Sequence, residues 1–325
     1  MGPQPLTRGS SAGRIGGDAS GVALAFRGPI AARVGLPGSL RDAGPVLILF
    51  LPPALLLFTI LVVLPIGEAG WYSFFDWSGY GLPTNFIGWR NFELIARYPA
   101  FRTALFNNLL IIAVSLLVQL PFALWLATLV STRIRGALTF RMIFFLPYVL
   151  ADVAAGLIWR FMYDGDYGLV AAIAHALGLQ APYPLADPAW AMYAILVVIV
   201  WKYFGFHMML FIAGLQGIDR SLYEAADIDG AGRIQRFRSI TLPLLVPTIR
   251  LSVFFSVIGS LQLFDMIMPL TKGGPADSTQ TLVTFLYSYG IMRMRVGFGS
   301  AVGVVLFAIC VIFAFSYKRL AFRHA

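Results

Sequence analysis

A cluster of six ionisable side chains lies between residues 221 and 245, in a chain that is 59% hydrophobic and only 12% charged. Ser221 and Glu224 have the S-x-x-E spacing of a capping box, in which each side chain satisfies the other residue's free backbone N–H group. A helix is therefore predicted to begin at Ser221 and to stop at Gly230 or Gly232, where glycine can take a left-handed conformation. A helix of about two turns is not stable alone in water. Its mixture of acidic and apolar side chains suits a groove on another protein, and a solvated loop is the alternative.

Motifs for catalysis or metal binding are absent from the sequence. A P-loop requires Gly-Lys-Ser/Thr, and none of the three lysines has these neighbours. The three histidines are too far apart in the sequence to suggest a metal site, and no other metal-ligand spacing is present. The chain is therefore not expected to be an enzyme or to bind a metal, and any energy source must come from another polypeptide.

Two charged residues fall inside apolar stretches. Counted from the ends of their own helices at about 1.5 Å per residue, Lys202 and Asp152 lie at similar depth in a hydrocarbon core about 30 Å thick. A structural ion pair between them is the favoured interpretation. The alternative is that Lys202 binds an anionic solute, such as a uronic sugar or glycerol phosphate.

Polar residues also recur along the stretch 244–270. Ser256 and Ser260 are four residues apart, and Gln262 and Asp265 follow them. An amide or carboxylate in so apolar a helix is costly without a purpose, so we expect these four residues to line a solute pathway. Close helix packing is the alternative for the serines, and a place at the outer mouth is the alternative for Asp265.

Apolar blocks of about 20 residues, the length that crosses a bilayer as an α-helix, must position these groups. The mean hydropathy of +0.79 is far above that of a water-soluble domain. We therefore predict an all-α membrane protein with six transmembrane helices, near residues 46–66, 107–130, 142–162, 190–215, 244–270 and 297–317.

Lysine and arginine predict the orientation of these helices, because cytoplasmic segments collect positive charge. The two ends, the 131–141 loop and the 216–243 loop with adjoining Arg250 hold sixteen of the 24, against six in the three opposite segments. Both termini are therefore predicted to be cytoplasmic, with a flexible tail over 1–44, a transmembrane domain over 45–317 and a short tail over 318–325. Topology explains the net charge of +9, so no nucleic-acid partner is expected.

The spacing of residues in the polar loop resembles a known family. Glu224-Ala225-Ala226 is followed after three residues by Gly230, after nine more by Ile240, and after one more by Leu242-Pro243. This pattern is similar to the loop of the membrane subunits of binding-protein-dependent ABC importers. The resemblance implies the type I permease fold and a coupling helix that docks on a separate ATP-binding subunit. The residues expected to make this contact are Glu224, Ala225, Ala226, Asp229 and Gly230.

Three further stretches indicate the carbohydrate branch of that family, of maltose-permease type. They are ALFNNLL at 104–110, FFLPYVLADVAAGLIWRFMY at 144–163 and LFDMIMPLTKGGPADSTQTLVTFLY at 263–287. The resemblance implies import of a sugar or sugar-like solute across the bacterial inner membrane, and a sugar site lined in part by Tyr203 and Gly205. The particular solute is not predicted.

The same resemblance implies the partners. These are a second, homologous permease subunit, a pair of ATP-binding subunits, an extracytoplasmic solute-binding protein, the solute and membrane lipid. ATP and Mg would be used by the ATPase, and no cofactor is expected on this chain. Three alternatives stay open: an ion-gradient-driven secondary carrier with Asp152 or Asp265 as proton site, an importer of an anionic solute such as glycerol 3-phosphate, and a non-transporting scaffold or sensor.

Overall fold

The computed structural model describes residues 2, 40–131 and 136–321. The predicted tails 1–44 and 318–325 lie largely outside these residues, but 40–44 and 318–321 are helical. The chain divides into two compact units, Met1–Leu64 and Pro65–Ala325. The first contains α1 (Leu40–Phe58) and the π-helical turn η1 (Thr59–Val63).

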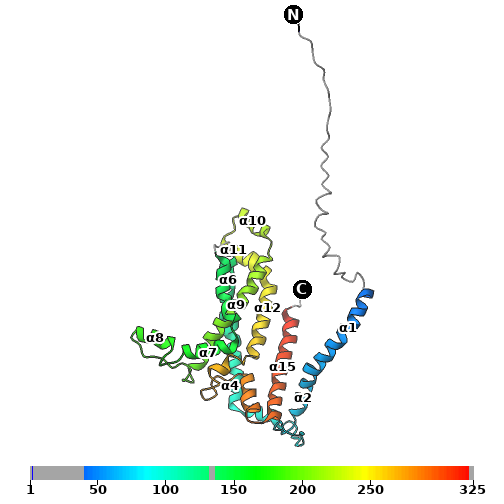
Figure 1. Cartoon of the computed structure of the whole chain (residues 1–325). Helices are drawn as coiled ribbons and strands as arrows, with labels where there is room; N and C mark the ends of the chain where they lie inside the picture. Colours follow the sequence, from blue (N-terminus) through cyan, green and yellow to red (C-terminus); the bar gives the residue numbers. More distant parts are fainter. Residues whose placement is uncertain (1, 3–39, 132–135, 322–325) are drawn as a thin grey trace. The chain divides into compact units, whose positions relative to one another are not determined.

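Helices account for nearly all regular structure in the described part of the chain, where the sole β contact is a bridge between Phe75 and Phe86. Figure 1 shows their course. After η1 the elements are α2 (Leu64–Tyr72), α3 (Arg90–Arg97), α4 (Pro99–Val114), η2 (Ser115–Gln119), α5 (Leu120–Ser131), α6 (Ala137–Val149), α7 (Asp152–Met162), α8 (Leu169–Ala176), α9 (Ala191–Gln216), α10 (Arg220–Ile228), α11 (Arg233–Arg236), η3 (Phe237–Thr241), α12 (Leu242–Leu261), α13 (Ile267–Leu270), α14 (Leu282–Phe285), η4 (Leu286–Ile291) and α15 (Val296–Ala321).

Membrane-length helices confirm the predicted all-α class. Among the described residues, five helical runs are long and apolar enough to span a bilayer, and a sixth span exists if a bent pair of helices is counted as one. The five unbroken runs are Ile48–Tyr72, Pro99–Val130, Ala191–Gln216, Arg233–Leu261 and Val296–Leu320.

The third predicted span is broken, which corrects the expectation of one helix over 142–162. Helices α6 and α7 meet at an angle of 94°. Leu150 and Ala151, between them, have extended backbone conformations, with ψ of 141° and 137°. Pro147, in the last turn of α6, has no N–H group to give to the helix, which weakens the helix just before the break.

The fifth span also differs from its predicted bounds of 244–270. Its helical run begins at Arg233 and ends at Leu261. Pro243 lies in the first turn of α12, ten residues inside the longer run. The π-helical turn η3 precedes it, and the N–H of Leu242 bonds to the carbonyl of Phe237, five residues earlier. A π-helical turn of this kind changes the direction of a helix without ending it.

Helix α9 is the central helix of the second unit. It packs against α5, α6 and α12, and more than half of its apolar window is buried. Two of the hydrophobic clusters in the core include residues of α9, and the third lies between α4, α12, α14 and α15. The apolar residues of α9 are distributed around the whole helix, which suits a position surrounded by other helices.

Two adjacent asparagines fasten the segment after α13 to helix α4. The amide of Asn107 donates to the carbonyls of Ser278 and Gln280, each at 2.8 Å. The Asn108 side chain donates to the carbonyl of Ser260 and accepts from the N–H of Leu282. Both asparagines are buried. They therefore replace the partners that this non-helical backbone would lack inside a membrane.

Candidate functional site

A cavity of about 330 Å³ lies between α4, η2, α6, α9 and α12. Its size is at the lower end of the range for small-molecule sites. Among the described residues that line it there is no Lys, Arg, Asp or Glu. The polar lining residues are Ser115, Gln119, Tyr148, Tyr203, His207, Ser256 and Ser260, and the others are Ile111, Ile199, Phe206, Phe255, Gly259 and Leu263.

Three polar groups of the cavity have no hydrogen-bond partner among the residues that the structure describes. They are Oε1 of Gln119, Nδ1 of His207 and Oγ of Ser256. These side chains are only 2%, 3% and 6% exposed. Buried polar groups are almost always hydrogen-bonded, because an unpaired one costs about 1–3 kcal/mol. The cavity therefore offers unsatisfied hydrogen-bonding groups from three different helical segments.

Aromatic rings form part of the wall beside these groups. The ring of Tyr148 stacks on that of Phe206, with centroids 4.9 Å apart and planes at 23°. Phe206 also contacts Phe255 edge to face, at 6.0 Å. Flat apolar faces next to hydrogen-bonding groups match the two surfaces of a sugar ring, its C–H faces and its hydroxyl edge.

The structure brings some of the predicted pathway residues to this cavity and not others. Tyr203, Ser256 and Ser260 line it. Gln262 and Asp265 follow the end of α12, are exposed, and are not among its described lining residues.

Gly205 is also outside the lining and instead lies where α9 touches α6. A Cβ atom on Gly205 would be only 2.1 Å from the carbonyl oxygen of Phe144. Glycine is therefore required at this position by the close approach of two backbones. The structure places Gly205 in the helix contact beside the cavity, and its part in a sugar site stays a prediction.

Gln119, His207 and Tyr148 were missed as pathway residues. The same argument that selected Gln262, an amide in an apolar helix, applies to Gln119 and would have found it. His207 follows Tyr203 at helical spacing of i and i+4, so the two share a face of α9. Tyr148 reaches the cavity from the turn just before the break, a placement that no sequence pattern indicates.

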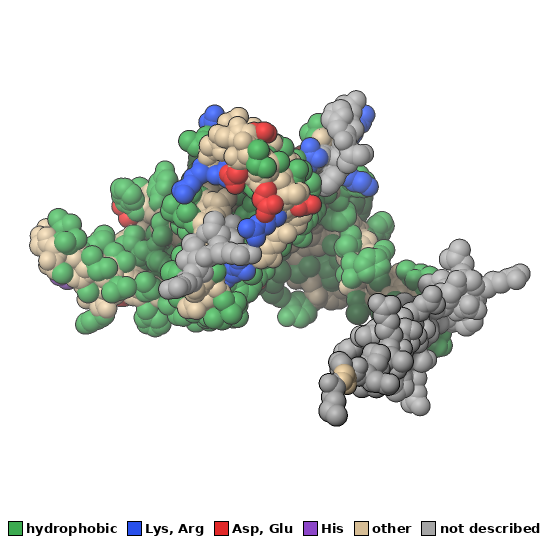
Figure 2. Space-filling view, turned by 90° about the horizontal axis from the view of Figure 1, so that it is seen from above, with side chains coloured by type: hydrophobic (Ala, Val, Ile, Leu, Met, Phe, Trp, Pro, Cys, Tyr) green, Lys and Arg blue, Asp and Glu red, His purple; other side chains and the backbone are tan. Residues whose placement is uncertain are grey.

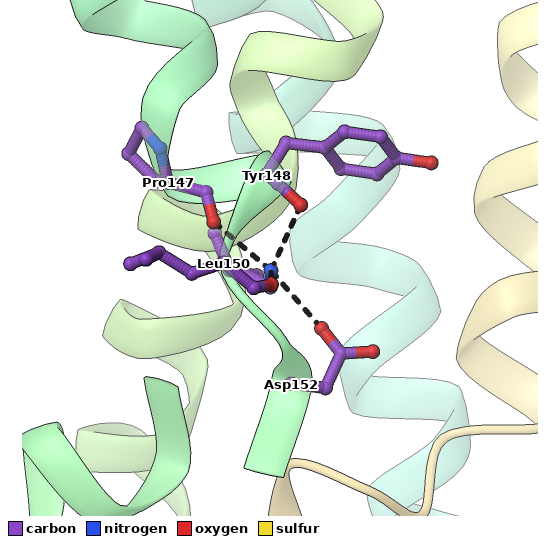
Figure 3. Close-up of polar contacts among 5 residues, drawn as sticks. Pro147, Tyr148, Leu150 and Asp152 are labelled. Carbon is purple, nitrogen blue, oxygen red and sulfur yellow. Dashed lines mark hydrogen bonds and ion pairs between the residues drawn. The ribbon is translucent and has the colours of Figure 1, made fainter. Parts of the chain in front are cut away.

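Asp152 lies at that break beside Pro147, Tyr148 and Leu150 (Figure 3), and Lys202 forms an ion pair with it. Nζ of Lys202 is 3.2 Å from Oδ1 of Asp152, and the Lys202 side chain is 1% exposed. Nζ also donates to the carbonyls of Pro147 at 2.9 Å, Tyr148 at 3.0 Å and Leu150. An ammonium group has three donors, so four oxygens of the chain itself occupy all of them.

Helix α10 occupies the predicted short-helix position, but its first turn differs from the expected capping box. The N-cap is Asp219, whose carboxylate accepts from the N–H of Ser221 at 2.9 Å. This bond lowers the pKa of Asp219 below its ordinary value. Glu224 instead pairs with Arg220, at 3.1 Å on the exposed helix surface. Asp219 and Ser221 are both good N-caps, and the extended backbone at Asp219 selects it.

The C-terminus of α10 ends in a Schellman motif. Gly230 has φ of +75°, a left-handed conformation. The N–H of Ala231 bonds to the carbonyl of Ala226 at 2.9 Å, and that of Gly230 bonds to Asp227 at 3.2 Å. Gly232, the other predicted stop, has φ of −67° and begins α11.

Side-chain contacts attach α10 to the N-terminal part of the fifth span. The hydroxyls of Tyr223 and Thr241 are 2.9 Å apart, and Arg236 pairs with Asp227. The other face of α10 is open, with Leu222 43% and Ile228 87% exposed. Figure 1 shows α10 beyond the ends of the long helices, and Figure 2 shows charged side chains gathered at this end of the molecule.

At the opposite end, acidic residues between α7 and α9 serve local turns. Asp164 accepts from the N–H groups of Asp166 and Tyr167, and these bonds lower its pKa. The hydroxyl of Tyr183 donates to Asp166 at 2.6 Å, which raises the pKa of the phenol.

Membrane-length helices around a cavity without charged lining residues, with a capped helix exposed at one end, describe a multi-pass membrane protein. Residues 119–324 match the family described as binding-protein-dependent transport system inner membrane component. The chain belongs to this family of transport permease subunits.

Named relatives agree with this assignment. The sulfoquinovosyl glycerol transport system permease protein SmoG of Agrobacterium fabrum is 37% identical, over 84% of this chain and 89% of that protein. The diacetylchitobiose uptake system permease protein NgcF of Streptomyces coelicolor is 37% identical, over 82% and 79%. The sn-glycerol-3-phosphate permease UgpA of Agrobacterium fabrum is 33% identical, over 83% and 92%.

A solved structure shares the fold. A chain of a bacterial ABC transporter involved in import of the acidic polysaccharide alginate superposes with a TM-score of 0.77 at 23% identity, covering 88% of this chain and 98% of that one. The fold is therefore the ABC importer type I permease fold.

Proposed function

We propose that this chain is the permease subunit of an ATP-driven importer that moves a sugar or sugar-like solute across the bacterial inner membrane. Its relatives are named as permeases for a sulfosugar glycoside, a disaccharide and glycerol 3-phosphate. The observation that carries the choice of a sugar is the cavity, with Gln119, His207 and Ser256 unpaired beside stacked aromatic rings. Sugar hydroxyls would satisfy those groups, and the rings would cover a C–H face.

The charge of the cavity favours an uncharged group at this position. An anion moved from water into a lining without a cation would lose its hydration with no partner in return. Nζ of Lys202 is 5.8 Å from the ring of Tyr148 in the cavity wall, but its donors are occupied by oxygens at the break between α6 and α7. The acidic part of an anionic solute would therefore need to be held by another subunit.

Energy would enter through α10, docked on a separate ATPase that binds ATP and Mg. Helix α10 is capped at both ends and exposes apolar and acidic side chains, which supports its role as a preformed helix that fits a groove on the ATPase. A second, homologous permease would complete the pathway, and a solute-binding protein would deliver the solute at the other end. The distribution of lysine and arginine supports cytoplasmic termini.

A single helical run connects α10 to the cavity. The run Arg233–Leu261 carries the attachment of α10 near one end and Ser256, Gly259 and Ser260 near the other. At 1.5 Å per residue, this helix spans about 35 Å between Arg233 and Ser256. A tilt of α10 would therefore move one wall of the cavity, so that ATP-driven closure would change which side of the membrane it faces.

Matched glycine variants test this function. In the reconstituted transporter, Gly230→Ala places a side chain on a residue with φ of +75°. A non-glycine residue in this left-handed conformation is less stable by about 1–2 kcal/mol. Gly232→Ala adds the same methyl group at φ of −67°, with open space around it. We expect Gly230→Ala to hydrolyse ATP with reduced solute uptake, and Gly232→Ala to match the unmodified transporter. Equal coupling in both variants, or uptake that needs an ion gradient but no ATP, would refute the proposal.

A further inference from the structure

The break between α6 and α7 collects oxygen atoms around one point. The last carbonyls of α6 have no partner within the helix, and they carry the negative end of its dipole. Three carbonyls from this region, those of Pro147, Tyr148 and Leu150, face Nζ of Lys202, and the carboxylate of Asp152 at the start of α7 completes the set (Figure 3). Carbonyls of a broken helix together with a carboxylate are the ligands by which transporters bind a coupling cation.

We propose that this break is a cation site filled by the chain's own Lys202 ammonium, and that the ammonium positions the cavity wall. We call the four oxygens and Nζ the ammonium cage. Lys202 is fully enclosed there, whereas the Asp152 side chain stays 35% exposed. The cation is therefore held mainly by backbone, and the carboxylate balances its charge.

The cage connects directly to the solute cavity. Tyr148 gives its carbonyl to the cage and its ring to the cavity, where it stacks on Phe206. Tyr203, next to Lys202 on α9, gives its ring to the same cavity. Nζ lies 5.8 Å from the Tyr148 ring centroid and 6.0 Å from that of Tyr203. Without the ammonium, the carbonyls would repel one another or turn toward water, and Tyr148 would leave its place in the wall.

This inference rests on the proposed function where it concerns solute, because Lys202 acts through Tyr148 and does not touch the cavity itself. Lys202 is therefore a positioning residue. Its removal should weaken the response to solute more than the basal ATP hydrolysis of the assembled transporter.

Two substitutions distinguish the contribution of the carbonyls from that of the carboxylate. Lys202→Met keeps most of the side-chain volume and removes the charge, whereas Asp152→Asn keeps the ammonium and its three carbonyl partners. We expect uptake to fall by about tenfold or more in Lys202→Met, as for the loss of a charge-assisted hydrogen bond, and by much less in Asp152→Asn. Equal losses in the two variants would show a simple ion pair and overturn the cage.

Chemical rescue is a sharper test. Lys202→Ala leaves room for n-propylammonium, which supplies the missing chain and ammonium, whereas tetramethylammonium has the same charge but no N–H donor. The thermal stability of the purified complex should recover in n-propylammonium and not in tetramethylammonium. Lys318→Ala, a lysine at the exposed end of α15, should respond to neither amine.

The stability measurement keeps the two proposals distinguishable, because it needs no solute. If the unmodified transporter moves no sugar but n-propylammonium still stabilises Lys202→Ala, the proposed function fails and the cage stands. If the transporter works and both amines act alike on Lys202→Ala, the cage fails. If Lys202→Ala does not assemble with either amine, the comparison of Asp152→Asn with Lys202→Met decides.

Discussion

A methyl group added at Gly205 should destabilise the folded permease, whereas the same group added at Gly259 should not. The Cβ of an alanine at 205 would lie 2.1 Å from the carbonyl oxygen of Phe144 and 3.1 Å from Cα of Phe145. Ordinary contact begins at 3.4 Å, so α6 and α9 would have to separate by about 1.3 Å. Because both partners are backbone, no side-chain rotation can relieve the contact. Overpacking of this kind costs about 1–3 kcal/mol.

Gly259 is the matched control. It is also inside a long helix, but a Cβ atom there would meet nothing within 4 Å. Alanine is up to about 1 kcal/mol more favourable than glycine within a helix, so Gly259→Ala should be as stable as the unmodified chain or more so. Gly259 lines the cavity, and the added methyl group would make that cavity smaller. Gly259→Ala should therefore alter solute uptake without loss of stability.

Thermal unfolding of the purified complex, followed with uptake in proteoliposomes, distinguishes the two variants. We expect a lower unfolding temperature for Gly205→Ala only, and a changed dependence of uptake on solute size for Gly259→Ala. An unfolding temperature that is unchanged in Gly205→Ala would mean that α6 and α9 are not in close contact at this point.

Three further predictions concern polar groups. Asn108→Leu should lower the free energy of unfolding by about 2–4 kcal/mol, because it leaves the carbonyl of Ser260 and the N–H of Leu282 unpaired, and thermal unfolding would measure this. Gln119→Leu should leave stability unchanged or raised, since Oε1 has no partner among the described residues, while uptake falls by about tenfold. The bond from Ser221 N–H to Asp219 should weaken only in acid: a lowered folded-state pKa means that the cap is present above the ordinary value of 3.8 and is lost as the pH falls through the folded pKa. The protection of the Ser221 amide from exchange, taken relative to its intrinsic rate at each pH, would follow this loss, and in Asp219→Asn that protection should no longer change with pH.

The membrane helices could be predicted from sequence because each needs about 20 apolar residues, a signal that does not depend on neighbours. The short helix at the polar loop was also predictable, from its caps and glycines. Its first residue was not, because Asp219 and Ser221 are equally suitable N-caps and only the backbone conformation chooses between them. The bounds of the fifth span failed for a related reason: η3 lets the helix continue through Pro243, and a proline signals a helix start without saying whether helix precedes it.

The cavity was predictable only in part. Serines at a spacing of four residues indicate one face of α12, and Ser256 and Ser260 do line the cavity. Gln262 and Asp265 were assigned to the same pathway as the serines on the expectation that the helix continues to residue 270, but α12 stops at Leu261. Gly205 illustrates a second limit, because a glycine in a helix can mark either a ligand or a neighbouring backbone, and only the structure distinguishes them.

Lys202 and Asp152 show why a correct contact can follow from an incomplete picture of the helix. The depth argument assumed one unbroken helix over 142–162, and the structure has a bend of 94° directly before Asp152. The depth of Asp152 was counted from residue 142, at the N-terminal end of the predicted span. That part of the span is α6, which runs without interruption to Val149. The bend therefore changes the course of everything after Asp152 but hardly changes Asp152 itself. The carbonyls of Pro147, Tyr148 and Leu150 could not be predicted as partners of Lys202, because in an unbroken helix they would accept hydrogen bonds from N–H groups of the next turn. The break leaves these carbonyls free to accept from an ammonium group.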